Sequence, residues 1–290
     1  MTAEAVMTVA ACTLVGLVVG SFLNVVVARV PAEESVVRPG SRCPRCGTPI
    51  APRDNIPVLS WLLLHGRARC CGTPISARYP IVELATAAAF GVVTAWATGL
   101  WTPARLGEDP AAMAADSLTP PAWHGALWPL PAFLYLAAAG IALAAIDLDT
   151  HRLPFWIVVP SWWVSGVLLG GAALLLGHPA AIGRTLAGGL ALWGLYRLLH
   201  AVYPPGMGYG DVRLAGLLGM YLSWLDWGTL AAGAFLGFLV GGAGGLALVV
   251  ARRSGLKTEI PFGPYMLVGA WIGIFWGQQL VSAYLRTTGV

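Results

Sequence analysis

Long apolar stretches, separated by short polar or glycine- and proline-rich segments, run through most of this chain of 290 residues. An α-helix needs about 20 apolar residues to cross a bilayer. The pattern therefore predicts an all-α, polytopic membrane protein with about eight transmembrane helices. The sixth stretch is short, and Asp226 separates it from the seventh, so merging these two would lower the count by one. The expected spans are residues 5–28, 80–100, 128–147, 155–177, 181–202, 212–225, 227–250 and 263–285.

Composition supports a membrane protein. The chain is 57% hydrophobic and 10% charged, whereas a soluble domain has about 25% charged residues. The net charge is only +4 and most of it lies in one loop, so nucleic acid is not an expected partner. The N-terminal stretch is long and no positive segment precedes it, so we interpret it as a retained first span and not as a cleavable signal peptide. We expect no internal repeat.

Charge in the loops predicts the orientation. The 101–127 loop is mainly acidic, whereas basic residues gather at 29–79 and 251–262, which the positive-inside rule places in the cytoplasm. We therefore expect a first transmembrane helix at 1–28, a small cytoplasmic, basic, cysteine-containing loop domain at 29–79, and a transmembrane core at 80–290. The arginines of the loop domain would also contact anionic lipid headgroups. The basic residues are Arg29, Arg38, Arg42, Arg45, Arg53, Arg67, Arg69, Arg78, Arg252, Arg253 and Lys257.

Two aspartates stand at the ends of apolar stretches. Asp147 ends the third expected span, and Asp211 follows Gly208-Tyr209-Gly210 at the start of the sixth. Alternate crossings bring both to the cytoplasmic face, and an ionisable group at membrane depth is by default functional. Two carboxylates that approach each other divide into a general base, which activates water, and a general acid. We predict Asp147 and Asp211 as the catalytic pair, in a site open to cytoplasmic water.

The neighbouring glycines predict how a peptide would bind. Without side chains, Gly208 and Gly210 let an extended peptide backbone approach closely, so we assign them to substrate positioning together with Asp149. The alternative for any aspartate at a helix end is a simple helix cap. Asp149 and Asp226 fit that alternative as well.

Ordered motifs over nearly the whole chain resemble the type IV prepilin peptidase family, polytopic membrane aspartyl proteases of the Gly-x-Gly-Asp type. The first aspartate motif runs from Asp147 to Leu153-Pro154, and the second is Gly206-Met207-Gly208-Tyr209-Gly210-Asp211. The other matching motifs are Gly20-Ser21-Phe22-Leu23-Asn24-Val25-Val26, Cys43-Pro44-Arg45-Cys46-Gly47, Asp54-Asn55-Ile56-Pro57-Val58-Leu59-Ser60-Trp61, Pro74-Ile75-Ser76-Ala77-Arg78-Tyr79-Pro80, Glu83 and Pro261-Phe262-Gly263-Pro264.

The resemblance implies an activity. It is cleavage of type IV prepilin or pseudopilin leader peptides after a glycine at the cytoplasmic face of a prokaryotic inner membrane, in many members followed by N-methylation with S-adenosylmethionine. The chain departs from the family pattern at two places. Phe155 follows Pro154 where the family usually has Asp or Asn, and Val212-Arg213 follows Asp211 where it usually has an aromatic residue and a lysine.

Four cysteines of the loop domain predict a zinc site: Cys43, Cys46, Cys70 and Cys71. Many family members carry two Cys-x-x-Cys pairs, and the resemblance places Cys71 at the last family cysteine and Ala68 at the missing one. Cys70 or His65 would then supply the fourth ligand. Reduced thiols without metal are the alternative, and a disulfide is disfavoured in the cytoplasm. Cys12 lies within the first span and is expected only to pack.

Two other functions remain open at this point. A transporter could use an aspartate pair as a proton relay, which would place the carboxylates near mid-membrane. A non-catalytic membrane protein could bind pilin-like chains without cleaving them. The intact aspartates favour the peptidase.

Overall fold

A computed structural model describes residues 3–101, 127–204, 207–250 and 261–288. Each of the predicted spans is an α-helix, so the all-α fold class is confirmed. The charged residues of the acidic 101–127 loop, the basic residues of the 251–262 loop and Gly206 of the second aspartate motif lie outside the described ranges. The helices are α1 (Ala3–Arg29), α2 (Leu59–Leu63), α3 (Arg78–Ala97), α5 (Leu130–Thr150), α6 (Phe155–Leu175), α7 (Ala180–Val202), α8 (Tyr209–Leu225), α9 (Trp227–Val250) and α10 (Gly263–Thr288), with a 3-10 turn η1 (Pro52–Asp54).

Not every helix is long and apolar enough to cross a bilayer. Within the described residues, six helices are long and apolar enough to span a bilayer: α1, α3, α5, α6, α9 and α10. Helix α8 has 17 residues and is shorter than these. The count of eight transmembrane helices therefore stays a prediction.

The chain breaks between α8 and α9 at Asp226, as predicted. Asp226 Oδ1 accepts the Thr229 N–H at 2.7 Å, and Oδ2 accepts the Thr229 hydroxyl at 2.5 Å. A carboxylate that satisfies a free N–H in the first turn is a helix N-cap. The cap interpretation of Asp226 is therefore confirmed, and α8 and α9 are two helices.

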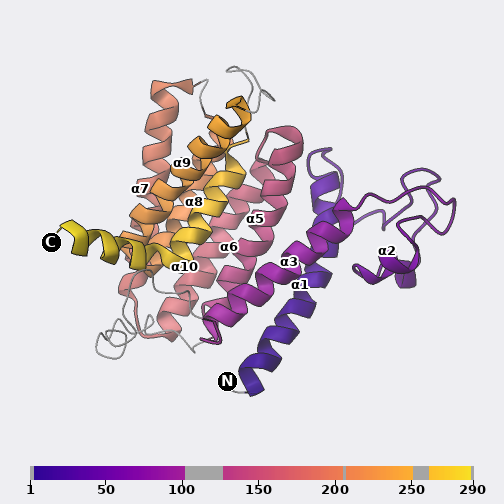
Figure 1. Cartoon of the computed structure of the whole chain (residues 1–290), viewed down its shortest axis with the longest axis horizontal. Coiled ribbons are helices and arrows are strands. Elements are labelled where there is room, and N and C mark those ends of the chain that lie inside the picture. The colour runs from indigo at the N-terminus through magenta and orange to yellow at the C-terminus, as the bar shows by residue number, and fades with distance from the viewer. Residues whose placement is uncertain (1–2, 102–126, 205–206, 251–260, 289–290) are drawn as a thin grey trace.

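Glycine allows three pairs of helices to pack unusually closely. A Cβ added at Gly20 of α1 would lie 2.7 Å from the α3 backbone, and one at Gly219 of α8 would lie 2.6 Å from the Gly188 carbonyl oxygen of α7. A Cβ at Gly269 of α10 would lie 2.2 Å from the Gly237 nitrogen of α9. Helices in membranes associate through such small residues, because lipid gives them no hydrophobic drive to associate. In Figure 1 the α1–α3 pair lies beside the bundle of α5 to α10.

Replacing Gly269 by Ala is expected to destabilise the fold. Because the new methyl group would meet the α9 backbone, the helices must separate, at a cost of about 1–3 kcal/mol in the free energy of unfolding. Thermal unfolding of the detergent-solubilised protein measures this. Gly170→Ala in α6, where a Cβ meets nothing within 4 Å, is the matched control and should be at least as stable as the wild type. Equal stability of the two variants would contradict close packing of α9 and α10.

Helix α8 lies at the centre of the bundle. From Asp211 to Trp224 all its residues except Arg213 are buried, because α6, α7, α9 and α10 pack around it. Its side chains also form polar contacts inside the bundle: the Tyr221 hydroxyl lies 2.8 Å from Ser165 Oγ and donates to the Ala132 carbonyl. The helix that carries Asp211 is thus held on all sides.

Candidate active site and cysteine cluster

Asp147 lies in the last turn of α5. The helix continues to Thr150 and its C-cap is His151, a left-handed residue with φ 52°. The helix therefore ends three residues after the predicted span 128–147, and Asp147 lies in its last turn. Its Oδ2 accepts the N–H of Gly263 at the start of α10, at 3.1 Å. Only 4% of the residue is exposed.

Asp211 is the third residue of α8. Its Oδ2 accepts the N–H of Gly208, the N-cap, at 3.1 Å. Gly210 belongs to the first helical turn, so α8 begins three residues before the predicted span 212–225. The backbone hydrogen bond of the Asp211 N–H to the Gly208 carbonyl closes that turn early.

Leu153, in the turn between α5 and α6, lies against Gly210, which precedes Asp211, and near Gly263, which donates to Asp147. A Cβ at Gly210 would lie 2.8 Å from Leu153 Cβ, and one at Gly263 would lie 3.4 Å from Leu153 Cδ1 and 2.8 Å from Asp147 Oδ2. The absence of side chains at both glycines thus lets α8 and α10 close on this turn. Asp147, in the last turn of α5, and Asp211, in the first turn of α8, therefore lie beside the same turn. The structure brings the predicted pair to one end of the bundle.

The two carboxylates are not open to solvent. Asp147 is 4% and Asp211 8% exposed, and each has a backbone N–H as its partner. The prediction of a site freely open to water is therefore wrong. Sequence reasoning missed this because Asp147 is buried against Gly263 of α10, which lies 116 residues further along the chain.

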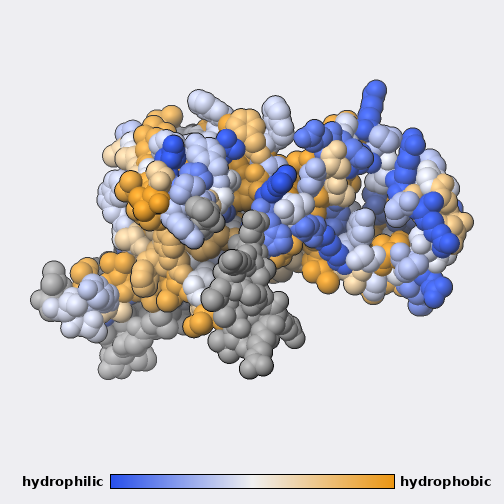
Figure 2. Space-filling model, turned by 90° about the horizontal axis from the view of Figure 1, so that it is seen from above, coloured by the Kyte–Doolittle hydropathy of each residue, from blue (hydrophilic) through white to orange (hydrophobic). Residues whose placement is uncertain are grey.

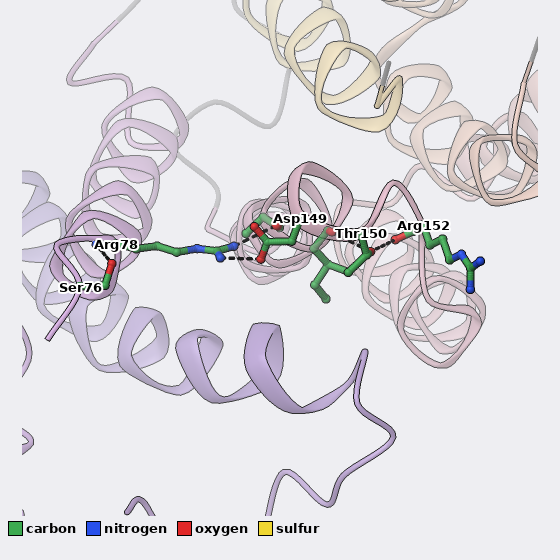
Figure 3. A network of polar contacts seen from close by, with 7 residues as sticks. Ser76, Arg78, Asp149, Thr150 and Arg152 are labelled. Carbon is green, nitrogen blue, oxygen red and sulfur yellow. Dashed lines mark hydrogen bonds and ion pairs between the residues drawn. The ribbon is translucent and has the colours of Figure 1, made fainter. Parts of the chain in front are cut away.

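Asp149 points away from the pair, toward α3. Its Oδ2 lies 2.5 Å from Arg78 Nη1, and Arg78 Nη2 donates to the Ala145 carbonyl at 3.0 Å (Figure 3). The side chains of Arg78 and Asp149 are 40% and 43% exposed. Asp149 therefore connects the start of α3 to the end of α5, and the structure does not bring it to Asp147 and Asp211. Its role in substrate positioning stays a prediction.

The segment between α1 and α3 folds as two similar turns. The Cys43 N–H donates to Thr48 and the Gly47 N–H to Cys43; the Ala68 N–H donates to Thr73 and the Gly72 N–H to Ala68. Both glycines have positive φ, 70° and 68°. The sequences of the two turns match as well, at Arg42–Ile50 and Arg67–Ile75. An internal repeat is present here, contrary to our expectation, and Ala68 stands at the position of Cys43.

The repeated turns bring the four predicted cysteines together. All four Sγ atoms lie within 4.8 Å of one another. The Sγ separations are 3.6 Å for Cys43 and Cys71, 3.2 Å for Cys46 and Cys70, and 3.9 Å for Cys70 and Cys71. A tetrahedral zinc with Zn–S bonds of about 2.3 Å needs sulfur atoms about 3.8 Å apart, so the cluster fits zinc. His65 is not in this group, so Cys70 completes it.

The cysteines differ in their tendency to ionise. Hydrogen bonding to the Thr48 side chain lowers the pKa of Cys46 to about 6, and the backbone N–H of Cys46 lowers the pKa of Cys43. Hydrogen bonding to Cys46 raises the pKa of Cys70 to about 12.

Hydrogen bonds join the cysteine segment to α3 and hold the segment together internally. Glu83 Oε2, buried in α3, accepts the Val58 N–H at 2.6 Å, and Trp61 Nε1 donates to the Ile75 carbonyl at 3.0 Å. Arg69 pairs with Asp54 at 2.9 Å and lowers the pKa of that carboxyl. Figure 2 shows hydrophilic side chains gathered over this segment, on the right, beside the more apolar bundle.

Comparison with known proteins places the chain in a family. Residues 14–97 match the Bacterial Peptidase A24 N-terminal domain, and residues 134–248 match the Type IV leader peptidase family. Proteins named prepilin leader peptidase/N-methyltransferase are 35% identical in Pseudomonas aeruginosa over 96% of this chain and 94% of the relative, and 37% identical in Aeromonas salmonicida over 94% and 92%. One from Burkholderia pseudomallei is 33% identical over 93% and 86%. No solved structure matches. Since this similarity extends over nearly the full length of both chains, the chain belongs to the type IV leader peptidase family.

Proposed function

We propose that the chain is a membrane aspartyl endopeptidase that cleaves the leader of type IV prepilin or pseudopilin precursors after a glycine, at the cytoplasmic face of a prokaryotic inner membrane. The observation that carries this proposal is that two buried carboxylates, Asp147 and Asp211, lie beside the Leu153 turn at one end of the bundle. The names of the relatives support the substrate class.

The geometry supports a division of roles within the pair. Like charges at close range do not both ionise, so one carboxylate keeps a proton. The ionised one takes a proton from the attacking water, and the protonated one polarises the scissile carbonyl and then protonates the leaving amine. The N–H groups of Gly263 and Gly208 hold the two carboxylates in place, which reduces the reorganisation that the reaction needs.

Substrate positioning is proposed for Gly208 and Gly210. Gly208 precedes the turn that carries Asp211, and a Cβ there would lie 3.3 Å from Asp211 Oδ2. A side chain would therefore compete with a peptide for the space beside the carboxylate. Because the two carboxylates are buried, the residues around them must move when a peptide binds.

Two further components belong to the proposal. The methyltransferase part of the relatives' names supports N-methylation with S-adenosylmethionine as donor. Zinc, held by Cys43, Cys46, Cys70 and Cys71, would stabilise the 29–79 loop domain. The arginines of that domain would contact anionic headgroups on the cytoplasmic side.

A proton-relay transporter is the second candidate. It would need carboxylates near mid-membrane, whereas Asp147 lies in the last turn of α5 and Asp211 in the first turn of α8. The position of the pair therefore favours the peptidase. The third candidate, a non-catalytic protein that binds pilin-like chains, requires no reaction at the pair.

Cleavage of a pilin-like precursor by the purified, detergent-solubilised protein tests the proposal. Mass spectrometry of the product should give a new N-terminus directly after glycine, and a methylated N-terminus when S-adenosylmethionine is present. Binding of the precursor without cleavage would support the non-catalytic candidate. Neither binding nor cleavage, across several precursors, would reject both.

Replacing Asp149 by Asn is expected to change the turnover number by less than about fivefold. An exposed ion pair contributes about 0–1 kcal/mol, and Arg78 keeps its hydrogen bond to the Ala145 carbonyl. The cleavage rate at saturating precursor measures the effect. A loss as large as that for Asp147→Asn would identify Asp149 as a reacting carboxylate, and a rise in KM alone would support its role in substrate positioning.

A further inference from the structure

Arg213 lies between two aromatic rings beside the catalytic pair. Its guanidinium carbon is 4.6 Å from the ring centre of Tyr209, one turn earlier on α8, and 4.8 Å from that of Phe155, the first residue of α6. Cation–π contacts are effective within about 6 Å of the ring centre. We call Phe155, Tyr209 and Arg213 the aromatic clamp.

The aromatic clamp joins the first turn of α8 to the α5–α6 turn. That turn already touches α8 where Leu153 faces Gly210, and the Phe155–Arg213 contact adds a second point on the other side of Asp211. The backbone carbonyl of Arg213 also accepts Trp162 Nε1 of α6, at 3.0 Å. Asp211 thus lies between two points at which α8 is attached to its neighbour.

Helix α7 contacts the residues just before Asp211. The ring of His200 meets the ring of Tyr209 edge to face at 5.6 Å, and His200 Nδ1 lies 2.9 Å from the Met207 carbonyl oxygen. Met207 immediately precedes Gly208, whose N–H is the partner of Asp211. The segment from Met207 to Arg213 is therefore fixed by α6 and α7 together.

Resting on the proposed peptidase function, we propose that Arg213 and Phe155 are positioning residues that set the place of Asp211 relative to Asp147. Among the described contacts, neither side chain touches Asp147 or Asp211, so the clamp acts through the turn that carries Asp211. Phe155 and Arg213 are also two of the positions at which the chain departs from its family's motifs. The structure places these two departures in contact, so they act as one unit.

Loss of the aromatic clamp is expected to loosen the first turn of α8. Amide hydrogen exchange of the full-length protein in detergent should accelerate about three- to tenfold at residues 208–213 in both Phe155→Leu and Arg213→Met. Exchange within α3 and α10 should not change. Trp163→Leu, at a residue 77% exposed on the same helix as Phe155, is the matched control. This measurement does not need an active enzyme.

The kinetic counterpart uses the same variants with a prepilin-like precursor. The turnover number should fall about three- to tenfold in each single variant, with KM unchanged, and the double variant should lose no more than the worse single one. Arg213→Lys, which keeps the charge, should lose less than Arg213→Met. Phe155→Asp, which offers Arg213 a carboxylate in place of the ring, should keep a turnover number closer to the wild type than Phe155→Leu does.

Three outcomes would overturn the proposal. They are unchanged exchange at 208–213 in both single variants, faster exchange with an unchanged turnover number, and losses that multiply in the double variant. If the wild type cleaves no precursor, the peptidase proposal fails, while the exchange data still decide whether the aromatic clamp orders the turn.

Discussion

Replacing Asp147 or Asp211 by Asn is expected to abolish precursor cleavage, with a loss of at least about 10³-fold in the turnover number. A positioned acid or base contributes about 10²–10⁴-fold, and in a two-carboxylate mechanism neither partner replaces the other. An amide at either position is neither the base that activates water nor the acid that protonates the leaving amine. Each single variant should therefore be as inactive as the double variant.

The Asn variants are expected to fold. The amide oxygen of Asn still accepts the N–H of Gly263 or Gly208, so the contacts that Asp147 Oδ2 and Asp211 Oδ2 make are retained. Elution as a single species in detergent and an unfolding midpoint near that of the wild type check this. Inactivity in a folded protein then reports on chemistry and not on stability.

Asp226→Asn is the matched control for both variants. It makes the same chemical change at a carboxylate that caps α9, and Asn is as good an N-cap as Asp. Cleavage should remain near the wild-type rate. Retained cleavage in Asp147→Asn or Asp211→Asn would reject the aspartyl mechanism, and inactivity of all three would point to loss of the fold.

The helices and the aspartate pair were predictable because they depend on local sequence. Runs of apolar residues predict spans, and the ends of the runs brought Asp147 and Asp211 to one face. The burial of the pair was not predictable, since it depends on helices far apart in the sequence. Gly263 of α10 reaches Asp147 only when α10 packs beside α5, and Asp211 is buried by the helices around α8. The predicted end of α5 was three residues too early, because the helix continues past the apolar run to Thr150.

Contacts between residues far apart in the chain could not be predicted from the sequence either. The sequence marked Arg78 as a loop arginine and as part of a family motif, but its pairing with Asp149 needed α3 beside α5. Phe155 and Arg213 appeared as unrelated departures from the family pattern, and their contact needed α6 beside α8. The repeat at Arg42–Ile50 and Arg67–Ile75 was present in the sequence, but the two segments differ at three of nine positions, including Ala68 in place of Cys43.

The purified chain is expected to hold about one zinc ion, and Cys43→Ser or Cys71→Ser should remove it. Structural zinc stabilises a small fold by about 10–16 kcal/mol in metal-binding peptides, so the 29–79 domain should become sensitive to protease. Elemental analysis and limited proteolysis measure the two effects. Cys12→Ser, at a cysteine in α1 outside the cluster, should leave the metal content unchanged. Wild-type protein that is metal-free and equally protease-resistant would contradict the zinc site.

The repeat leads to a stronger test of the same cluster. Cys70→Ala alone should lose the metal, because only Cys43, Cys46 and Cys71 remain of the four. Adding Ala68→Cys to Cys70→Ala should restore it, since Ala68 holds the place in the second turn that Cys43 holds in the first, with the same backbone hydrogen bonds. If the double variant stays metal-free, the two turns are not equivalent as ligand sites. If the double variant binds zinc as tightly as the wild type, position 68 can replace position 70 as the source of the fourth ligand.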